Sequence, residues 1–151
     1  MARSRGGVND FVIKLANVNG TGSASANGLL MRSLFRMGLP VSGNNFFPSN
    51  IQGLPTWYEI RISKDGYLGA GGRVDVMVAM NAQTYSDDIA ELAPGGIFIY
   101  DASWPRDAQF GRSDVQVIGI PLSMMGRNHD ERRPFIFRFF LRYKNSGRRI
   151  D

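Results

Sequence analysis

Strand-like and helix-like segments alternate along most of this chain, and few folds accommodate that order. Strand-like runs cover residues 10–18, 39–43, 56–63, 74–80, 97–100 and 115–120, and helix-like runs cover 24–37 and 82–92. A strand that is followed by a helix and another strand usually forms a right-handed crossover in a parallel sheet. The order therefore predicts an α/β fold, namely a three-layer, Rossmann-like domain with a mainly parallel sheet.

The middle of the chain interrupts this alternation. Residues 44–55 are rich in turn formers, and residues 56–63 then alternate apolar and polar side chains, as a strand with one buried face does. The turn Lys64-Asp65-Gly66 leads into Tyr67-Leu68, which predicts an antiparallel hairpin inserted into the sheet. Further along, we expect Pro94-Gly95-Gly96 to end the second helix before the strand at 97–100.

The composition is that of one globular domain. A chain of 151 residues, 43% of them hydrophobic, is long enough to bury a core without disulfides or metals. It contains no cysteine, which excludes disulfides, an all-cysteine iron–sulfur cluster and the usual structural zinc site within this chain. The sequence has neither a secretory leader nor a run of about 18 apolar residues, so we expect a cytoplasmic protein without a membrane partner.

The net charge of +5 is unevenly distributed. Residues 1–126 contain ten basic and ten acidic residues, whereas residues 127–151 contain eight basic and three acidic ones. The whole excess therefore lies in the C-terminal segment. Nucleic acid is not expected as a partner of the neutral α/β body, because polyanion binding needs clustered basic residues.

A glycine loop, Asn19-Gly20-Thr21-Gly22-Ser23-Ala24-Ser25, lies between the first strand and the first helix, where backbone N–H groups and the helix dipole can face an anion. Ser25 stands where the dinucleotide fingerprint has its third glycine, and no acidic residue between Asp10 and Glu59 is available to bind a ribose. The loop therefore argues against an NAD site. Two interpretations stay open: an anion-binding loop, or glycines that only permit a tight turn and close packing.

Other groups that could carry chemistry have simpler interpretations. His129 is the only histidine and lies in the basic segment, so we expect a solvated side chain. Asp75, Asp87, Asp88 and Asp101 could on paper form an acid/base or magnesium site, but Asp87-Asp88 is expected on an exposed helix face and Asp101 at a strand end. The aromatic residues are interpreted as core or interface anchors; they are Phe46, Phe47, Trp57 and Tyr58.

Four segments, taken in order, carry a family resemblance. They read VNDFVIKLANVNGTGSASANGLLMRSLFRMG, GNNFFPSNIQGLPTWYEIRISKDGY, GRVDVMVAMNAQTY and LAPGGIFIYDASWP. Over about residues 8–125 they resemble the gamma-type domain that one branch of the 2-oxoacid:ferredoxin (or flavodoxin) oxidoreductases carries at the N-terminus of the alpha subunit. The block FPSNIQGLPTWYEIR is similar to the 2-oxoglutarate-type branch, whereas pyruvate-type relatives commonly have adjacent glycines and Arg-Gly-Gly where this chain has Gly22-Ser23 and Gln52-Gly53.

The resemblance implies one component of a thiamine-diphosphate enzyme that converts a 2-oxoacid to an acyl-coenzyme A and passes electrons to ferredoxin or flavodoxin. The complex would use thiamine diphosphate, Mg²⁺, iron–sulfur clusters and coenzyme A. Alpha and beta subunits or domains would hold thiamine diphosphate, because this chain lacks the Gly-Asp-Gly type motif for its Mg²⁺. This chain would be inactive alone, without catalytic residues. By resemblance, the face toward coenzyme A comprises Gly20, Thr21, Gly22, Ser23, Asn50, Gln52 and Gly53.

The segment 126–151, GRNHDERRPFIFRFFLRYKNSGRRID, differs from the preceding sequence in composition and pattern. One hypothesis is a truncated or frame-shifted end. The other is a strand or core-covering segment built on its aromatic residues, Phe135, Phe137, Phe139 and Phe140. A different function also remains open for the whole chain, namely a non-redox α/β module that binds a nucleotide or polyanion.

Overall fold

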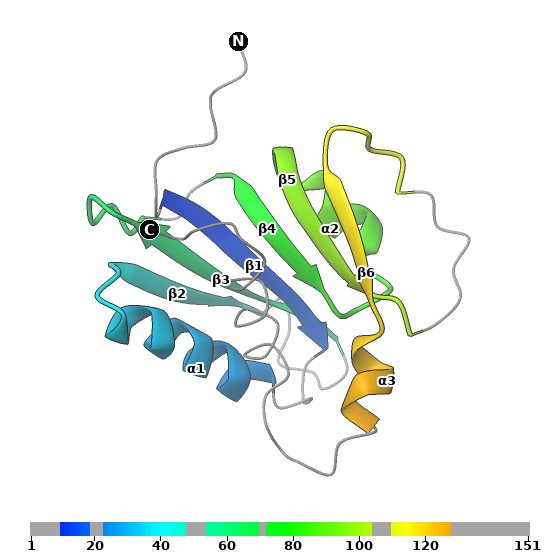
Figure 1. Ribbon diagram of the computed structural model, residues 1–151, viewed down its shortest axis with the longest axis horizontal. Coiled ribbons are helices and arrows are strands. Elements are labelled where there is room, and N and C mark those ends of the chain that lie inside the picture. The colour runs from blue at the N-terminus through cyan, green and yellow to red at the C-terminus, as the bar shows by residue number, and fades with distance from the viewer. Residues whose placement is uncertain (1–9, 19–22, 48–53, 70–71, 104–109, 128–151) are drawn as a thin grey trace.

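The computed structural model describes residues 10–18, 23–47, 54–69, 72–103 and 110–127, with only the backbone described for 125–127. These residues form a six-stranded sheet in the order β2-β3-β1-β4-β5-β6 (Figure 1). The elements are β1 Asp10–Val18, α1 Ser23–Arg36, β2 Val41–Phe46, β3 Pro55–Ser63, β4 Val74–Ala79, α2 Tyr85–Ala90, β5 Leu92–Asp101, β6 Gln116–Ile120 and α3 Leu122–Arg127. Strands β1, β4, β5 and β6 run parallel, and β3 pairs antiparallel with both β1 and β2. The predicted α/β fold with a mainly parallel sheet is confirmed.

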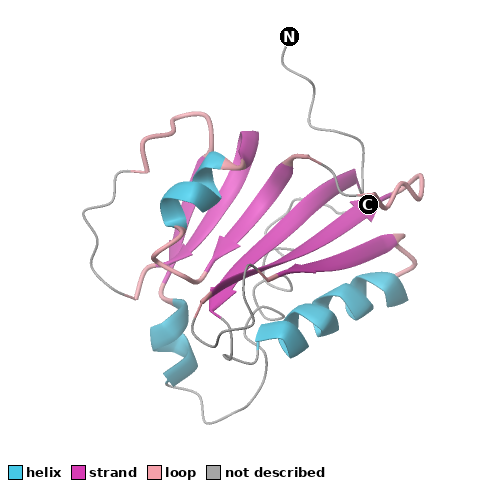
Figure 2. Cartoon of the chain, turned by 180° about the vertical axis from the view of Figure 1, so that it is seen from behind, coloured by secondary structure: helices cyan, strands magenta, loops and turns pink. Residues whose placement is uncertain are grey.

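Helices α1 and α2 lie on opposite faces of the sheet, which gives three layers (Figures 1 and 2). Leu30 of α1 packs into a core cluster with Ile13 and Val78, whereas Ile89 of α2 packs into a second cluster with Met77. Met77 and Val78 are neighbours in β4 but belong to different clusters, because successive side chains of a strand point to opposite faces. In the part of the chain that is described, no helix is long and apolar enough to cross a membrane.

The antiparallel part of the sheet differs from the predicted hairpin. Strand β2 extends to Phe46, into residues whose turn-forming composition predicted a loop, and it pairs with β3 from Val41 opposite Ile62 to Phe46 opposite Trp57. Gly66 does turn the chain, with φ of 75°, but Tyr67 and Leu68 form no strand. Both edges of β3 are already paired, with β1 and β2, so no edge is left for a strand after the turn.

The second helix and the strand after it also differ from the prediction. Helix α2 ends at Ala90, and β5 begins at Leu92, so Pro94-Gly95-Gly96 lies inside the strand and does not separate helix from strand. The register between β4 and β5 shifts between Val74 and Val76, opposite this part of β5. Gly95 has φ of 78°, and a Cβ on Gly96 would lie 2.8 Å from the Ala93 carbonyl oxygen. The glycines therefore accommodate an irregular strand.

Candidate functional site

The candidate site is the edge of the sheet at which the parallel strands end. After β1 the chain continues into α1 on one face, and after β4 it continues into α2 on the other (Figure 1). Since β1 and β4 are neighbours in the sheet, their connections diverge at this edge. Open α/β sheets bind ligands outside the carboxyl ends of strands at such a point. Topology alone makes this edge the first candidate for ligand binding.

The described residues next to two segments singled out in the sequence lie at this edge. Strand β1 ends at Val18, just before the glycine loop, and β3, which runs in the opposite direction, begins at Pro55, just after the block 48–53. Val18 and Pro55 are paired across the two strands. Ser23 is the first residue of α1 and is half-buried. The other predicted site residues, Gly20, Thr21, Gly22, Asn50, Gln52 and Gly53, lie outside the described residues, so their placement stays a prediction.

Buried amide side chains occur on the elements that meet at this edge. Asn17, near the end of β1, donates from Nδ2 to the Leu15 carbonyl oxygen at 3.3 Å. Asn27 of α1 and Asn81, which follows β4, are buried, and neither Asn27 Oδ1 nor Asn81 Nδ2 has a hydrogen-bond partner among the described residues. A buried polar atom without a partner costs about 1–3 kcal/mol. One acceptor and one donor are thus buried without a partner among the described residues, and nothing in the sequence pattern had marked them.

Asp101 is the last residue of β5 and connects that strand to α3. Its Oδ1 accepts hydrogen bonds from the Ser103 amide at 3.0 Å and the Ser103 hydroxyl at 2.5 Å, and its Oδ2 accepts one from the Ser123 hydroxyl. Burial by itself raises the pKa of Asp101, but the hydrogen bonds from Ser103 and Ser123 outweigh it and hold the pKa below its ordinary value. The predicted strand-end position is confirmed, and the carboxylate holds the start of α3 against β5.

Asp88 was expected beside Asp87 on an exposed helix face, and this prediction is wrong for Asp88. Asp87 is exposed, but Asp88 is 1% exposed and accepts hydrogen bonds from Trp57 Nε1 and Thr84 Oγ1, both at 2.7 Å. Burial raises the pKa of Asp88, and the bonds from Trp57 and Thr84 offset part of that shift. Consecutive helical residues point about 100° apart, and Asp88 lies with Tyr85 and Ile89 on the buried face of α2, whereas Asp87 lies on the solvent side.

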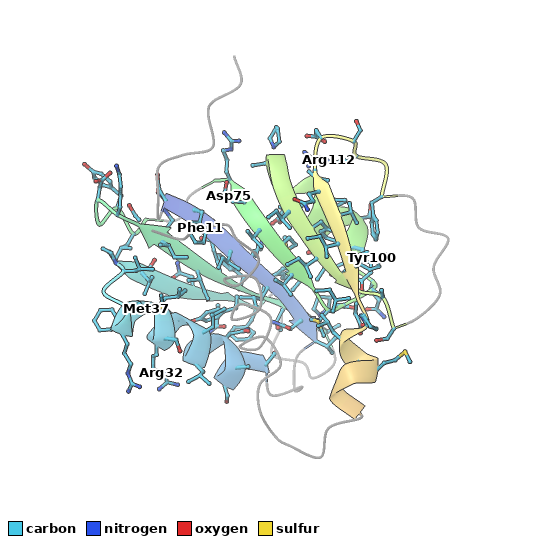
Figure 3. All side chains as sticks on the ribbon, viewed as in Figure 1. Phe11, Arg32, Met37, Asp75, Tyr100 and Arg112 are labelled. Carbon is cyan, nitrogen blue, oxygen red and sulfur yellow. The ribbon has the colours of Figure 1, made fainter. Side chains whose placement is uncertain are left out.

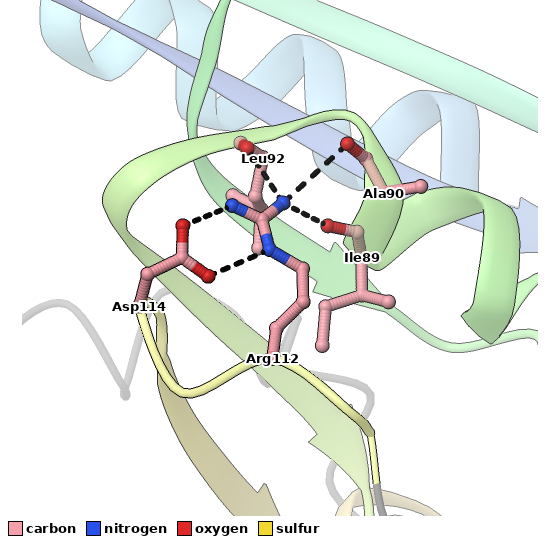
Figure 4. Close-up of polar contacts among 5 residues, drawn as sticks. All are labelled: Ile89, Ala90, Leu92, Arg112 and Asp114. Carbon is pink, nitrogen blue, oxygen red and sulfur yellow. Dashed lines mark hydrogen bonds and ion pairs between the residues drawn. The ribbon is translucent and has the colours of Figure 1, made fainter.

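A polar cluster at the opposite edge of the sheet has a structural explanation. Arg112 Nη1 donates to the carbonyl oxygens of Ile89 and Leu92, both at 2.8 Å, and the guanidinium pairs with Asp114 at 2.9 and 2.6 Å (Figure 4). Figure 3 places Arg112 at the end of the molecule away from α3. The last carbonyls of a helix lack intrahelical partners. Arg112 satisfies such carbonyls of α2 and is therefore a capping residue, which its sequence context did not indicate.

The four carboxylates considered as an acid/base or magnesium site do not come together. Asp75 accepts a hydrogen bond from the Val12 amide at 2.9 Å near the start of β4, whereas Asp101 lies at the end of β5. Within the described ranges, no group of three or more His, Cys, Asp or Glu residues could hold a metal ion. The candidate site therefore offers amide and hydroxyl groups for binding rather than a metal-ligand set.

Several known proteins are similar to this chain in sequence and in fold. A family model described as pyruvate ferredoxin/flavodoxin oxidoreductase matches residues 12–136. Subunit alpha of 2-oxoacid:ferredoxin oxidoreductase 2 from Aeropyrum pernix is 27% identical over 92 residues, which are 61% of this chain and 14% of that protein. A solved 2-oxoglutarate:ferredoxin oxidoreductase from Magnetococcus marinus, with 2-oxoglutarate, coenzyme A and succinyl-CoA bound, matches 80% of this chain and 21% of its own, with a TM-score of 0.70 and 27% identity.

Two smaller solved chains have the same fold. A pyruvate oxidoreductase subunit from Thermotoga maritima has a TM-score of 0.63 and 21% identity, covering 80% of this chain and 66% of its own. The gamma subunit of a keto/oxoacid ferredoxin oxidoreductase from Geobacter sulfurreducens has a TM-score of 0.60 and 15% identity, covering 78% and 65%. At these identities the likeness shows the fold. This chain spans less than two thirds of the length of each relative named here.

Proposed function

This chain belongs to the pyruvate ferredoxin/flavodoxin oxidoreductase family, and we propose that it is the gamma-type part of a 2-oxoacid:ferredoxin oxidoreductase. The proposed substrate is 2-oxoglutarate, because the Magnetococcus relative that is 27% identical carries 2-oxoglutarate and succinyl-CoA. The proposed reaction is oxidative decarboxylation to an acyl-coenzyme A, with electrons passed to ferredoxin or flavodoxin.

The role proposed for this chain is to shape the approach of coenzyme A, and the observation that carries it is the pairing of Val18 with Pro55. That pairing joins the origin of the glycine loop to the end of the 48–53 block at the diverging edge. Asn27 Oδ1 is an acceptor and Asn81 Nδ2 is a donor, but both atoms are buried and are not open to a ligand. We propose that these asparagines support the predicted loop residues that orient coenzyme A.

We propose that this chain does not itself hold thiamine diphosphate. Its diphosphate binds through Mg²⁺, and the sequence lacks the Gly-Asp-Gly type motif that usually supplies a ligand to this ion. The chain also has no cysteine for an iron–sulfur cluster. We therefore assign the carbon chemistry and the clusters to alpha and beta subunits or domains, and to this chain only binding and orientation.

Reconstitution with the partner subunits tests this proposal. Acyl-coenzyme A synthesis and 2-oxoglutarate-dependent viologen reduction should require this chain, which should show neither activity alone. Asn81→Ala is expected to raise the KM for coenzyme A by roughly tenfold, the effect of losing one hydrogen bond, with kcat little changed. The Tm should also fall, because the substitution removes the acceptor of the Gln83 amide, so KM is measured at a temperature at which the variant is folded. Gln83→Ala, an exposed side chain in the same loop, serves as the control. Full activity of the partners without this chain would contradict the proposal.

Bulky substitutions at Gly22 and Gly53 provide a second test of the proposal. Gly22→Val and Gly53→Val are expected to block close approach of backbone to ligand and so to lower kcat/KM for coenzyme A. Glycines that serve packing alone would instead lower activity and Tm in parallel. Melting curves recorded on the same variants separate these two outcomes.

A further inference from the structure

The side of α1 that faces away from the sheet combines apolar and basic side chains. The helix packs on β1, β2 and β3, and its core contacts include Leu30 and Leu34. Leu29, Arg32 and Arg36 follow one another at spacings of three and four residues, so they form one stripe along the helix. All three are exposed, and Figure 3 shows Arg32 on the side away from the sheet.

Two further apolar side chains extend this stripe. Phe35, three residues after Arg32, is 67% exposed, and Met37, just after the helix, is 62% exposed. Single exposed apolar residues are ordinary on protein surfaces, but here three lie within nine residues of one element. Phenylalanine, methionine and arginine are also the residue types enriched at protein–protein interfaces. We call Leu29, Arg32, Phe35, Arg36 and Met37 the α1 outer surface.

The arginines of this surface have no acidic partner in the described part of the chain. Arg32 donates from Nε to the Gly28 carbonyl oxygen at 3.1 Å, and its Nη donors have no partner among the described residues. Neither Arg32 nor Arg36 forms an ion pair with them. No acidic residue occurs between Asp10 and Glu59, so α1 and the neighbouring β2 carry none. The α1 outer surface is therefore positively charged and accessible.

Helix stability explains only one of these two arginines. Arg36 lies in the last turn of α1, where a positive charge complements the helix dipole. Arg32 lies one turn earlier, and like charges four residues apart destabilise a helix. Carboxylates supplied from outside the helix would offset this repulsion, and a guanidinium binds a carboxylate through two parallel hydrogen bonds.

We propose that the α1 outer surface docks an acidic segment of a partner subunit, whose Asp or Glu side chains pair with Arg32 and Arg36 while an apolar neighbour packs on Phe35. A twofold contact between two copies of this surface is disfavoured, because it would bring four arginines together. The inference rests on the proposed function, since the partner is another subunit or domain of the same oxidoreductase. It adds which surface of this chain that partner covers.

Photocrosslinking in the assembled complex locates the contact. Phe35 is replaced by p-benzoylphenylalanine in the full chain, and the same replacement of Phe46 is the control. Phe46 is 43% exposed and lies opposite Trp57 on the sheet face turned away from α1. The position 35 probe should crosslink to an alpha or beta subunit within a peptide that contains Asp or Glu.

Several results of this crosslinking would overturn the proposal. They are the absence of a crosslink from position 35, a crosslink within this chain or to a second copy of it, and a crosslink to a peptide without acidic residues. Capture of the same peptide equally from position 46 would do so too, because positions 35 and 46 lie on opposite sides of the sheet.

Affinity measurements on the same complex test the charges. Arg32→Gln and Arg36→Gln should each weaken binding of the partner by roughly tenfold to a hundredfold, the value of a charge-assisted hydrogen bond, without lowering the Tm of this chain. Arg73→Gln removes the same charge from an exposed position just before β4 and should leave the affinity unchanged. Phe35→Ala should weaken binding, and Phe46→Ala should not.

Salt and lipid complete the test. Added salt should weaken binding of the unaltered chain more than binding of the double variant Arg32→Gln/Arg36→Gln, because salt screens the charges that the variant lacks. Unchanged affinity in the arginine variants and in Phe35→Ala would exclude this surface. Binding of the chain to phosphatidylserine vesicles that Phe35→Ala abolishes would assign the surface to a lipid headgroup layer and overturn the proposal. Failure of the unaltered chain to bind its partners would instead contradict the proposed function.

Discussion

Trp57 Nε1 donates a 2.7 Å hydrogen bond to Oδ1 of Asp88 and so joins β3 to α2. The helix packs on β4 and β5, whereas β3 lies on the far side of β1, so the bond crosses the sheet face between two elements that are not adjacent. Asp88 therefore connects the packing of α2 to the antiparallel part of the sheet.

Removing the Asp88 carboxylate should destabilise the fold. Asp88→Ala leaves the partly buried indole N–H of Trp57 without its acceptor, and we expect the free energy of unfolding to fall by about 1–3 kcal/mol. Urea denaturation measures this loss. Asp87→Ala, at the exposed neighbouring position, should change stability by less than about 0.5 kcal/mol. Equal effects of the two substitutions would contradict the buried assignment of Asp88.

The titration of Asp88 should appear in the pH dependence of stability. Burial raises the pKa of Asp88 in the folded protein above its ordinary value of 3.8, so the folded state binds this proton more tightly than the unfolded chain. The stability that protonated Asp88 contributes is fully present below the pKa that Asp88 has in the unfolded chain. That stability is lost as pH rises through the higher pKa that Asp88 has in the folded protein. Asp88→Asn should lose less stability than the unaltered chain across that window. Urea midpoints measured over a pH series check this, and parallel curves would contradict it.

Gly43 should tolerate no side chain. A Cβ at this position would collide with the Tyr58 hydroxyl and lie 2.6 Å from Met31 Sδ. Gly43→Ala should therefore cost about 1–3 kcal/mol through overpacking. Tyr58→Phe in the same chain should recover part of that loss, because it removes the hydroxyl, and a double-mutant cycle measures the coupling. Gly28→Ala is a control of opposite sign, since its Cβ has room and the helix gains about 0.5–1 kcal/mol.

Arg112 should stabilise the junction between α2 and β5. Arg112→Lys keeps the charge but loses the planar guanidinium that reaches the carbonyl oxygens of Ile89 and Leu92 and the Asp114 carboxylate together. We expect a lower Tm and faster amide exchange at the end of α2 and the start of β5. Arg36→Lys, in the last turn of α1, is the matched control. Unchanged exchange in Arg112→Lys would show that the carbonyls are satisfied without the guanidinium.

The basic C-terminal segment should account for any nucleic-acid binding. Because residues 127–151 carry the whole excess of +5, binding should be weak, independent of sequence and steeply reduced by salt. A chain shortened by these residues should lose it. Filter binding of DNA at several salt concentrations measures both effects. Equal affinity before and after the deletion would move the binding site into the α/β body and favour the polyanion-binding alternative.

Local sequence was sufficient where one physical requirement decided the structure. The apolar runs at 10–18 and 74–80 form β1 and β4, because a strand whose two faces are both buried needs a nearly continuous run of apolar residues. Leu30 and Leu34 follow helical spacing, and α1 ends before Gly38, whose φ of 84° suits glycine. Ordered segments over residues 8–125 also indicated the family whose model matches residues 12–136.

Tertiary structure decided the features that depend on partners distant in the chain. Asp88 is buried because Trp57, 31 residues earlier, offers its indole N–H, and a helical pattern alone does not choose between Asp87 and Asp88. Pro94-Gly95-Gly96 lies within β5 because the pairing of β4 with β5 shifts register at this point. The unpaired amide atoms of Asn27 and Asn81 in the candidate site depend on burial. Burial is a property of the packed sheet, so no single segment of the sequence specifies it.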